Sequence, residues 1–316
     1  MVLILKILRR GYEKIFGFKK RTFFNPNPPD NVNQAASDLI YYALVSDRPC
    51  MISRMGSVEL DCINYYKLRS ENIFKNFIIG KIDSLNYPKN IVYRMENNAG
   101  FFPPINDNLD SFSKLYLSRI KDIDILGSWL NLENNFISEF AHVARVGLED
   151  LNAYNHKNPW SKVLEGKKVL VIHPFSESIE KQYLKREDLF VNKSILPEFK
   201  LITYRPVQSI AGSYKSLPYK DWFEALEKME KDINTIDFDI ALLGCGAYGL
   251  PLASFIKNMG KKAVHIGGSL QILFGITGRR WETEYDMSKF INEHWVRPSK
   301  EEIPKNFKDV ENGCYW

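Results

Sequence analysis

The chain has 316 residues, of which 45% are hydrophobic and 26% are charged, and its formal net charge is +5. This length and composition are ordinary for a soluble globular protein with one large α/β domain or two small ones. Residues 1–21 hold seven Lys/Arg and one acid, a net charge of +6, which leaves −1 for the rest. A body this close to neutral argues against a nucleic-acid-binding protein.

The N-terminal segment, residues 1–21, predicts a basic amphipathic helix. Its apolar run is too short to span a membrane, and its charges follow the apolar residues, unlike those of a signal peptide. Such a helix can lie on an anionic membrane surface, or it can pack on the domain with its basic face in solvent. The apolar positions of this helix are Leu3, Ile4, Ile7, Leu8, Ile15 and Phe16.

The rest of the chain predicts one α/β domain. We divide the sequence into an extension, 1–24, and a single catalytic domain, 25–316, with a break near 155–166 where two halves would meet. The four cysteines are scattered and form no C-x-x-C pair, which argues for a reducing compartment, such as the cytoplasm, and against a structural zinc site. They are Cys50, Cys62, Cys245 and Cys314.

The first half begins with a predicted helix over 33–45 and a strand over 50–53. The strand leads into a glycine turn at Gly56 and a helix that starts at Ser57, so Arg54, Ser57 and Glu59 meet at one junction. Glycine permits the turn, and serine is a common helix cap. Glu59 is a candidate catalytic group, although it could instead only complement the helix dipole.

The next segments predict irregular chain over 93–104, a helix over 109–120, a strand over 123–126 and a helix over 136–151. Trp129 closely follows the strand, where an indole could stack on a base or a sugar, although core packing is its commoner role.

The second half opens with a clear strand over 168–172, followed by His173. A histidine at this place could act as a base, although a hydrogen-bonded packing role is more usual. A helix over 177–189, a strand over 201–204 and a helix over 219–233 are expected next.

A strand–loop–helix–strand unit follows, with strands over 240–243 and 263–266 and a helix over 250–259. The loop contains Gly244, Gly246, Tyr248 and Gly249, with the spacing G-x-G-x-x-G. Such glycines let backbone N–H groups approach a phosphate at a helix N-terminus, or they serve only tight packing. An NAD site would also need an acid on the second strand, but that strand ends in His265, Gly267 and Gly268 without a carboxylate.

A short helix over 270–274 and a glycine turn precede two adjacent arginines, Arg279 and Arg280. Guanidinium groups bind diphosphates and carboxylates through paired hydrogen bonds, so both arginines are candidate ligands of a diphosphate.

Three of these segments together resemble the GT-D-type glycosyltransferases, a bacterial family that builds surface glycans and glycoproteins. Residues 53–59 are similar to the family's Arg-x-Gly-Asp-x-Glu signature, and residues 243–246 and 265–268 are similar to its later glycine segments. Arg54, Gly56 and Glu59 match the signature, whereas Ser57 replaces its aspartate. One carboxylate is a poor site for a divalent ion, so this departure predicts weak or absent dependence on Mn²⁺ or Mg²⁺.

The resemblance implies a Rossmann-like, doubly wound, mostly parallel sheet. It also implies transfer of a sugar from a UDP- or GDP-type nucleotide sugar to a glycan or lipid-linked acceptor, on the cytoplasmic face of the membrane. Glu59 would bind the sugar or act as the base, and His173 is the second candidate for the base. A nicotinamide-dependent oxidoreductase and a non-catalytic subunit of a glycan-assembly complex are the alternatives. The donor-binding residues would be Arg54, Gly56, Ser57, Trp129, Gly244, Gly246, Tyr248, Gly249, His265, Gly267, Gly268, Arg279 and Arg280.

Overall fold

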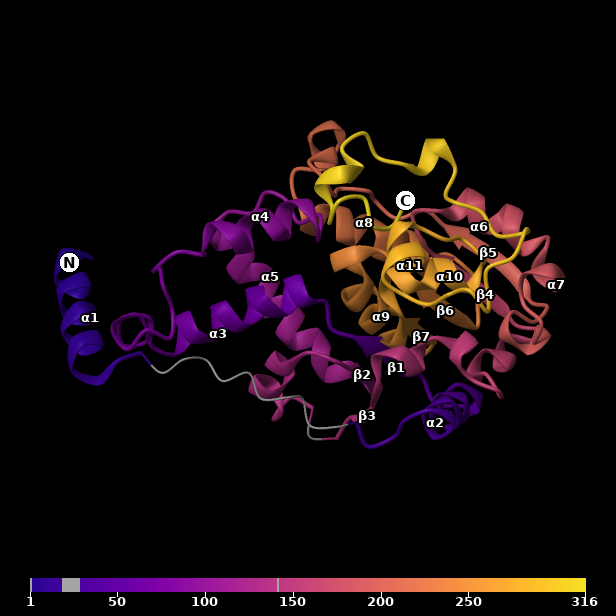
Figure 1. Ribbon diagram of the computed structural model, residues 1–316, viewed down its shortest axis with the longest axis horizontal. Coiled ribbons are helices and arrows are strands. Elements are labelled where there is room, and N and C mark those ends of the chain that lie inside the picture. Colours follow the sequence, from indigo (N-terminus) through magenta and orange to yellow (C-terminus); the bar gives the residue numbers. More distant parts are fainter. Residues whose placement is uncertain (1, 19–28, 141) are drawn as a thin grey trace.

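A computed structural model of the chain describes residues 2–18, 29–140 and 142–316. The described residues form one seven-stranded sheet in the order β3-β2-β1-β7-β6-β4-β5, and each strand runs parallel to its neighbours (Figure 1). The strands are β1 (Cys50–Arg54), β2 (Ile125–Ser128), β3 (Ala144–Gly147), β4 (Lys168–Ile172), β5 (Lys200–Tyr204), β6 (Ile240–Leu243) and β7 (Lys262–His265).

Two layers of helices cover the sheet because successive side chains of each buried strand point to opposite faces. In β4, Leu170 and Ile172 join one apolar cluster, and Val169 and Val171 join the other. The first cluster lies under α3 (Ser57–Ile78), α4 (Lys89–Asn97), α5 (Asn106–Arg119), α8 (Trp222–Asn234) and α9 (Gly249–Asn258). The second lies under α2 (Gln34–Val45), α6 (Ser176–Tyr183), α7 (Arg186–Leu189), α10 (Leu270–Leu273) and α11 (Arg279–Thr283). The fold is therefore a Rossmann-like, doubly wound α/β fold.

The strand order reverses at two places. From β1 the chain adds β2 and β3 on one side, whereas β7 lies on the other side of β1. Likewise β5 and β6 lie on opposite sides of β4. Open parallel sheets bind ligands at such reversals, beyond the carboxyl ends of the strands. The residues that follow β1, β4, β6 and β7 are therefore placed where a ligand is expected. The two halves of the chain share this one sheet, and residues 155–166 lie in the connection between β3 and β4.

The predicted helix over 136–151 is wrong. The segment instead contains β3, which pairs with β2 at the edge of the sheet, between short 3₁₀ turns. The apolar residues of the segment fit a helical period, but Val143 and Val146 are β-branched and Gly147 is a poor helix former, which favours the strand. Val146 is fully buried, so its packing against the sheet decides the conformation.

Three further expectations need correction. Residues 93–104 are not irregular throughout, because α4 covers the first part of the segment and ends at Asn97. The single helix expected over 177–189 is two helices, α6 and α7, with a break at Leu184 and Lys185. Strand β2 begins two residues later than predicted.

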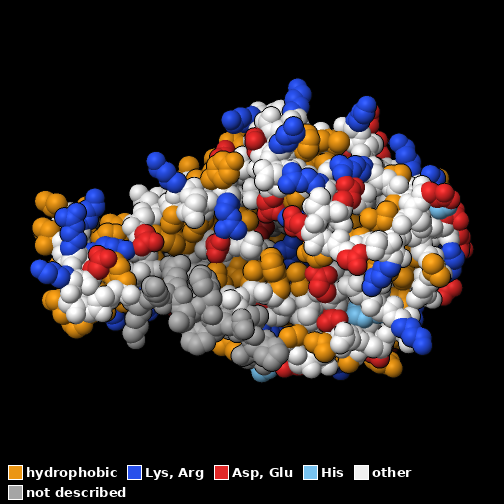
Figure 2. Space-filling view, in the orientation of Figure 1, with side chains coloured by type: hydrophobic (Ala, Val, Ile, Leu, Met, Phe, Trp, Pro, Cys, Tyr) orange, Lys and Arg blue, Asp and Glu red, His pale blue; other side chains and the backbone are white. Residues whose placement is uncertain are grey.

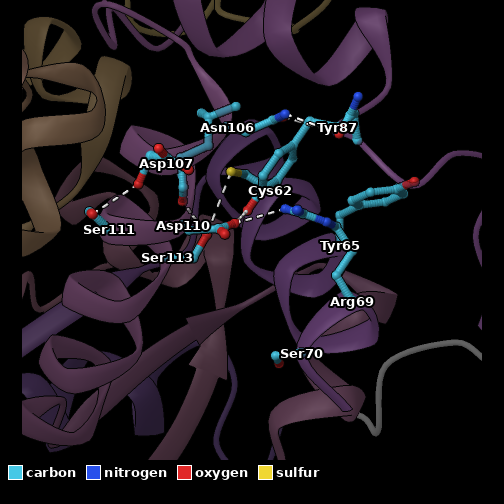
Figure 3. A network of polar contacts seen from close by, with 12 residues as sticks. Cys62, Tyr65, Arg69, Ser70, Tyr87, Asn106, Asp107, Asp110, Ser111 and Ser113 are labelled. Atoms are coloured by element: carbon cyan, nitrogen blue, oxygen red, sulfur yellow. Dashed lines mark hydrogen bonds and ion pairs between the residues drawn. The ribbon is translucent and has the colours of Figure 1, made fainter. Parts of the chain in front are cut away.

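A polar network ties α3 to α5 and to the chain before α4 (Figure 3). The Asp110 carboxylate accepts hydrogen bonds of 2.8 Å from Arg69 and from the Tyr87 hydroxyl. Deeper in the same contact, the Cys62 sulfur lies 3.7 Å from the Ser113 hydroxyl. These bonds fix α3, whose N-terminus follows β1 directly, and so they help to hold the β1–α3 turn in place.

Helix α1 (Val2–Phe16) lies far from the sheet and packs on α3 (Figure 1). Helix formation is thus found for the first part of the predicted extension, while Lys19, Lys20 and Arg21 lie outside the described residues. In the described ranges no helix is both long enough and apolar enough to cross a membrane.

Candidate functional site

A cavity of about 360 Å³ lies at the carboxyl ends of β1, β4, β6 and β7. The surface is hollowed near the middle of the face in Figure 2, where acidic and basic side chains come together. The sequence-predicted residues that line the cavity are Arg54, Gly56, Ser57, Glu59, Trp129, His173, Gly244, Gly246, Tyr248, His265, Gly267, Gly268 and Arg280. Gly249 and Arg279 do not line it.

Arg54, the last residue of β1, brings a positive charge into this cavity. Its Nη1 donates a hydrogen bond of 3.1 Å to the Met55 carbonyl, whereas its buried Nε has no hydrogen-bond partner. Among the described residues no carboxylate forms an ion pair with it. The guanidinium lies against Gly267, where any Cβ would come within 2.6 Å of Nη2. A half-buried guanidinium without an ion-pair partner favours an anionic ligand.

Glu59 lies in the first turn of α3, and its carboxylate folds back over Gly56 so closely that a Cβ there would overlap with it. Its side chain is buried at the cavity wall. Burial raises the pKa of the Glu59 carboxyl, and the nearby Arg54 charge opposes that effect only in part. A carboxyl with a raised pKa next to a cavity is suited to accept a proton near neutral pH.

Two buried histidines stand at the ends of β4 and β7. His265 is paired in register with Ser53 of β1, and its Nδ1 lies 3.0 Å from the Ser53 hydroxyl. His173 accepts a hydrogen bond of 3.0 Å at Nδ1 from the Phe175 N–H. Burial lowers the pKa of each imidazole to about 3, so both rings are neutral at pH 7. Because Nδ1 of His173 accepts, its Nε2 carries the proton, and this ring suits a hydrogen-bond donor better than the base expected from the sequence.

The glycines of the G-x-G-x-x-G loop have different physical roles. A Cβ at Gly244 would come within 2.6 Å of the Gly267 carbonyl oxygen and 2.7 Å of the His173 ring, and a Cβ at Gly249 would overlap with the His265 ring. These two glycines thus make room for neighbouring protein atoms. Gly246 differs, since it has a φ of 58° and the nearest atom to a Cβ would be 3.5 Å away. Only Gly246 leaves open space for a ligand beside the backbone.

We expect Gly249→Ala to lower the free energy of unfolding by about 1–3 kcal/mol, the usual cost of overpacking a close-packed site. The His265 ring cannot move away easily because it is buried and bonded to Ser53. Gly11→Ala is the matched control, since nothing lies within 4 Å of that position. Urea unfolding measures both. A Gly249→Ala protein as stable as Gly11→Ala would show that the His265 ring does not require this glycine.

Trp129 is 40% exposed, and its indole N–H donates a hydrogen bond of 3.0 Å to the Met55 carbonyl. The Arg54 guanidinium carbon lies 6.0 Å from the ring centroid. The indole is therefore held by one edge at the cavity wall and is not buried in the core. This placement leaves the ring able to stack on a flat ligand group.

The two adjacent arginines do not act together. Arg279 is exposed outside the cavity and donates to the Asn312 carbonyl. Arg280 lines the cavity, but it forms an ion pair with Glu311, and its guanidinium lies 4.9 Å from the centre of the Tyr315 ring. The diphosphate role expected for this pair is therefore not supported at Arg279, and the charge of Arg280 is already balanced.

Several cavity residues carried no recognisable sequence signal. Gln271 is fully buried, and its Oε1 has no hydrogen-bond partner, as is also true of the Trp316 indole N–H. A polar residue after the β5 strand, Gln208, could have been found by its position alone. The other polar and aromatic residues that the sequence did not single out are Asn98, Tyr116, Glu149, Asn152, Tyr154, Phe175, Ser209, Ser269, Trp281, Glu284, Tyr285, Glu311 and Tyr315.

The residues around Glu59 do not fit a divalent ion. Asp61, the nearest acid in the sequence, forms an ion pair of 2.5 Å with Arg94, and the Arg54 charge lies on the cavity side. In the part of the chain that the structure describes, no three His, Cys, Asp or Glu side chains are grouped to hold a metal. Cys245 is buried, and burial raises the pKa of its thiol, so it is a packing residue and not a nucleophile.

Comparison of the chain with protein-family models, with curated proteins and with solved structures gives no match.

Proposed function

We propose that this protein is a glycosyltransferase that uses a nucleotide-sugar donor, as its resemblance to the GT-D-type enzymes implies. The resemblance rests on Arg54, Gly56 and Glu59 at the β1–α3 turn and on the glycine segments after β6 and β7. All of these segments border the same cavity at the two strand reversals. This convergence of separate sequence segments supports the proposal.

The observation that carries the proposal is the Arg54 guanidinium, which has an unpartnered buried Nε and no carboxylate in an ion pair with it among the described residues. A donor diphosphate in the cavity would supply the negative charge that this guanidinium lacks. The backbone at Gly246 is the open position of the glycine loop, and the Trp129 ring is available for the base or the sugar. His265 is neutral and adds no second positive charge beside Arg54.

In the proposed reaction an acceptor hydroxyl oxygen attacks the anomeric carbon of the donor sugar. The new glycosidic bond forms as the bond from that carbon to the diphosphate oxygen breaks. Glu59 takes the hydroxyl proton, and the departing nucleoside diphosphate keeps the electron pair, its charge stabilised by Arg54. No residue changes its oxidation state, and Glu59 returns its proton to water after the product leaves.

The acceptor is a glycan or a lipid-linked glycan of the bacterial surface, modified on the cytoplasmic side before export. The four free cysteines, all buried, are consistent with a reducing compartment. The near-neutral body gives no support for a nucleic-acid acceptor.

An NAD(P)-dependent oxidoreductase is the second candidate, and the loop spacing is its support. What weakens it is the lack of an acid at the end of β7, because tight packing at Gly244 and Gly249 and open backbone at Gly246 also suit a dinucleotide loop. A non-catalytic subunit is the third candidate, supported by Ser57 in place of an aspartate.

Calorimetric titration separates the three candidates. We expect UDP or GDP to bind, and Arg54→Met to weaken that binding by about 10- to 100-fold, the usual loss for hydrogen bonds to a charged group. Arg279→Met is the matched control, because that side chain lies outside the cavity, and it should bind like the unaltered protein. Binding of NAD alone would support the oxidoreductase, and binding of no nucleotide would support the non-catalytic subunit.

A further inference from the structure

Helix α1 presents a stripe of large apolar side chains to solvent. The members of the stripe are between 50% and 73% exposed, and they lie at helical spacings on the side turned away from α3. Figure 2 shows orange and blue side chains together at this end of the molecule. The stripe consists of Leu3, Ile4, Ile7, Leu8 and Ile15, with Val2 and Phe16 exposed at its ends. Isolated exposed apolar residues are common, but a continuous stripe marks an interaction surface.

Contacts on the opposite side of α1 hold the helix with its apolar stripe turned away from α3. Leu5 is buried in the first apolar cluster, the one under α3, and Arg9 donates hydrogen bonds of 2.6 Å to the carbonyls of Phe77 and Ile82. Arg9 also forms an ion pair with Asp83. The helix therefore docks on the far end of α3 through a basic residue and one leucine. Within the described residues the apolar stripe stays largely exposed, in contrast to the apolar face of an ordinary surface helix.

Three exposed basic side chains, Lys6, Arg10 and Lys14, flank the stripe, while Glu13 is the acid among them. An apolar stripe bordered by cations is complementary to the acyl boundary and the negative headgroups of an anionic bilayer. Pairing with a second copy would instead bring two positively charged helices together. We propose that α1 binds the surface of an anionic lipid bilayer through this stripe.

Docking in this way would also set the position of the cavity. Helix α1 contacts α3, and the other end of α3 carries Glu59. A straight 22-residue helix is about 33 Å long, and α3 is shortened by a kink at Asn72. The Glu59 end of α3, and with it the cavity, therefore lies within about 33 Å of the membrane-bound helix. The inference needs only the surface of α1, and it holds whichever reaction the cavity catalyses.

Co-sedimentation with vesicles tests the proposal on the full chain. We expect binding to vesicles that contain equal amounts of phosphatidylcholine and phosphatidylglycerol, and much weaker binding to phosphatidylcholine alone. Lys6→Gln with Lys14→Gln should weaken partitioning by about 30-fold, since each cation near such a surface contributes about five-fold. Ile4→Ser with Leu8→Ser should weaken it on both kinds of vesicle.

Leu184→Ser with Val191→Ser is the matched control, because these exposed apolar residues lie on another part of the surface, and binding should not change. Circular dichroism verifies that each variant is folded. Equal binding by all variants, or binding that ignores lipid charge, would overturn the proposal. So would dimerisation in ultracentrifugation that is lost in Ile4→Ser with Leu8→Ser and accompanied by no vesicle binding, because the stripe would then be a contact between copies.

Discussion

Glu59→Gln is expected to slow sugar transfer by about 10²–10⁴-fold, the range typical of a lost general base. Glutamine has nearly the same shape but cannot take the acceptor proton. Burial, which exceeds the effect of Arg54, raises the pKa of Glu59. The acidic limb of the pH–rate profile should therefore lie above the usual carboxyl range, with activity rising as Glu59 loses its proton, and this limb should disappear in the variant. Release of UDP or GDP from a panel of nucleotide sugars, in the presence of acceptor glycans, measures both.

Asp61→Asn is the matched control for Glu59→Gln. It makes the same acid-to-amide change two residues away, at a side chain that faces Arg94 and not the cavity. We expect normal transfer by this variant. If Glu59 only complements the helix dipole, Glu59→Gln would instead lower the free energy of unfolding by about 0.3–1 kcal/mol and leave transfer unchanged. That result would remove the proposed base and leave Arg54 as a binding residue alone.

The centre of the sheet could be predicted from sequence because its strands contain short apolar runs with glycine or a polar residue at their ends. Strands β4 and β6 are of this kind, and nothing else fits their length and flanks. The edge strand β3 could not be found in this way. It is only partly buried, its apolar spacing fits a helix equally well, and its pairing with β2 is a contact that no local pattern reveals.

The residues that line the cavity could be predicted where they lie at the end of a strand or in the turn directly after it, as Arg54, Glu59 and His173 do. It was not predictable where a distant segment decides what a side chain does. Arg280 looks like a phosphate ligand in sequence, yet Glu311, 31 residues further on, takes up its charge. Gly249 likewise fits the spacing of a phosphate loop, but only the position of the His265 ring shows that this glycine makes room for protein atoms and not for a ligand.

Acid is expected to destabilise this fold well above the usual range of carboxyl titration. His173 and His265 have a pKa of about 3 in the folded protein, against 6.5 in an unfolded chain. Between these values the unfolded state binds two protons that the folded state does not. The stability that the neutral rings confer is therefore complete above pH 6.5 and is lost as the pH falls. Two protons correspond to about 3 kcal/mol per pH unit, or about 4 kcal/mol by pH 5.

A loss of this size is a large part of the roughly 5–15 kcal/mol that stabilises a typical domain. Glu59 acts in the opposite direction. Its raised pKa lets the folded state take up a proton at a higher pH than the unfolded state does, and this offsets part of the loss.

Urea unfolding at pH 7, 6 and 5 measures how steeply the free energy of unfolding falls with pH. The double variant His173→Asn with His265→Asn retains a polar group near the position of each Nδ1. It should show a weaker dependence of the free energy of unfolding on pH, even if it is less stable at pH 7. His294→Asn, at an exposed histidine, should leave the slope unchanged. A free energy of unfolding that is constant from pH 6.5 to 5 in the unaltered protein would show that the two rings take up protons while folded. The site would then carry more positive charge than Arg54 alone provides.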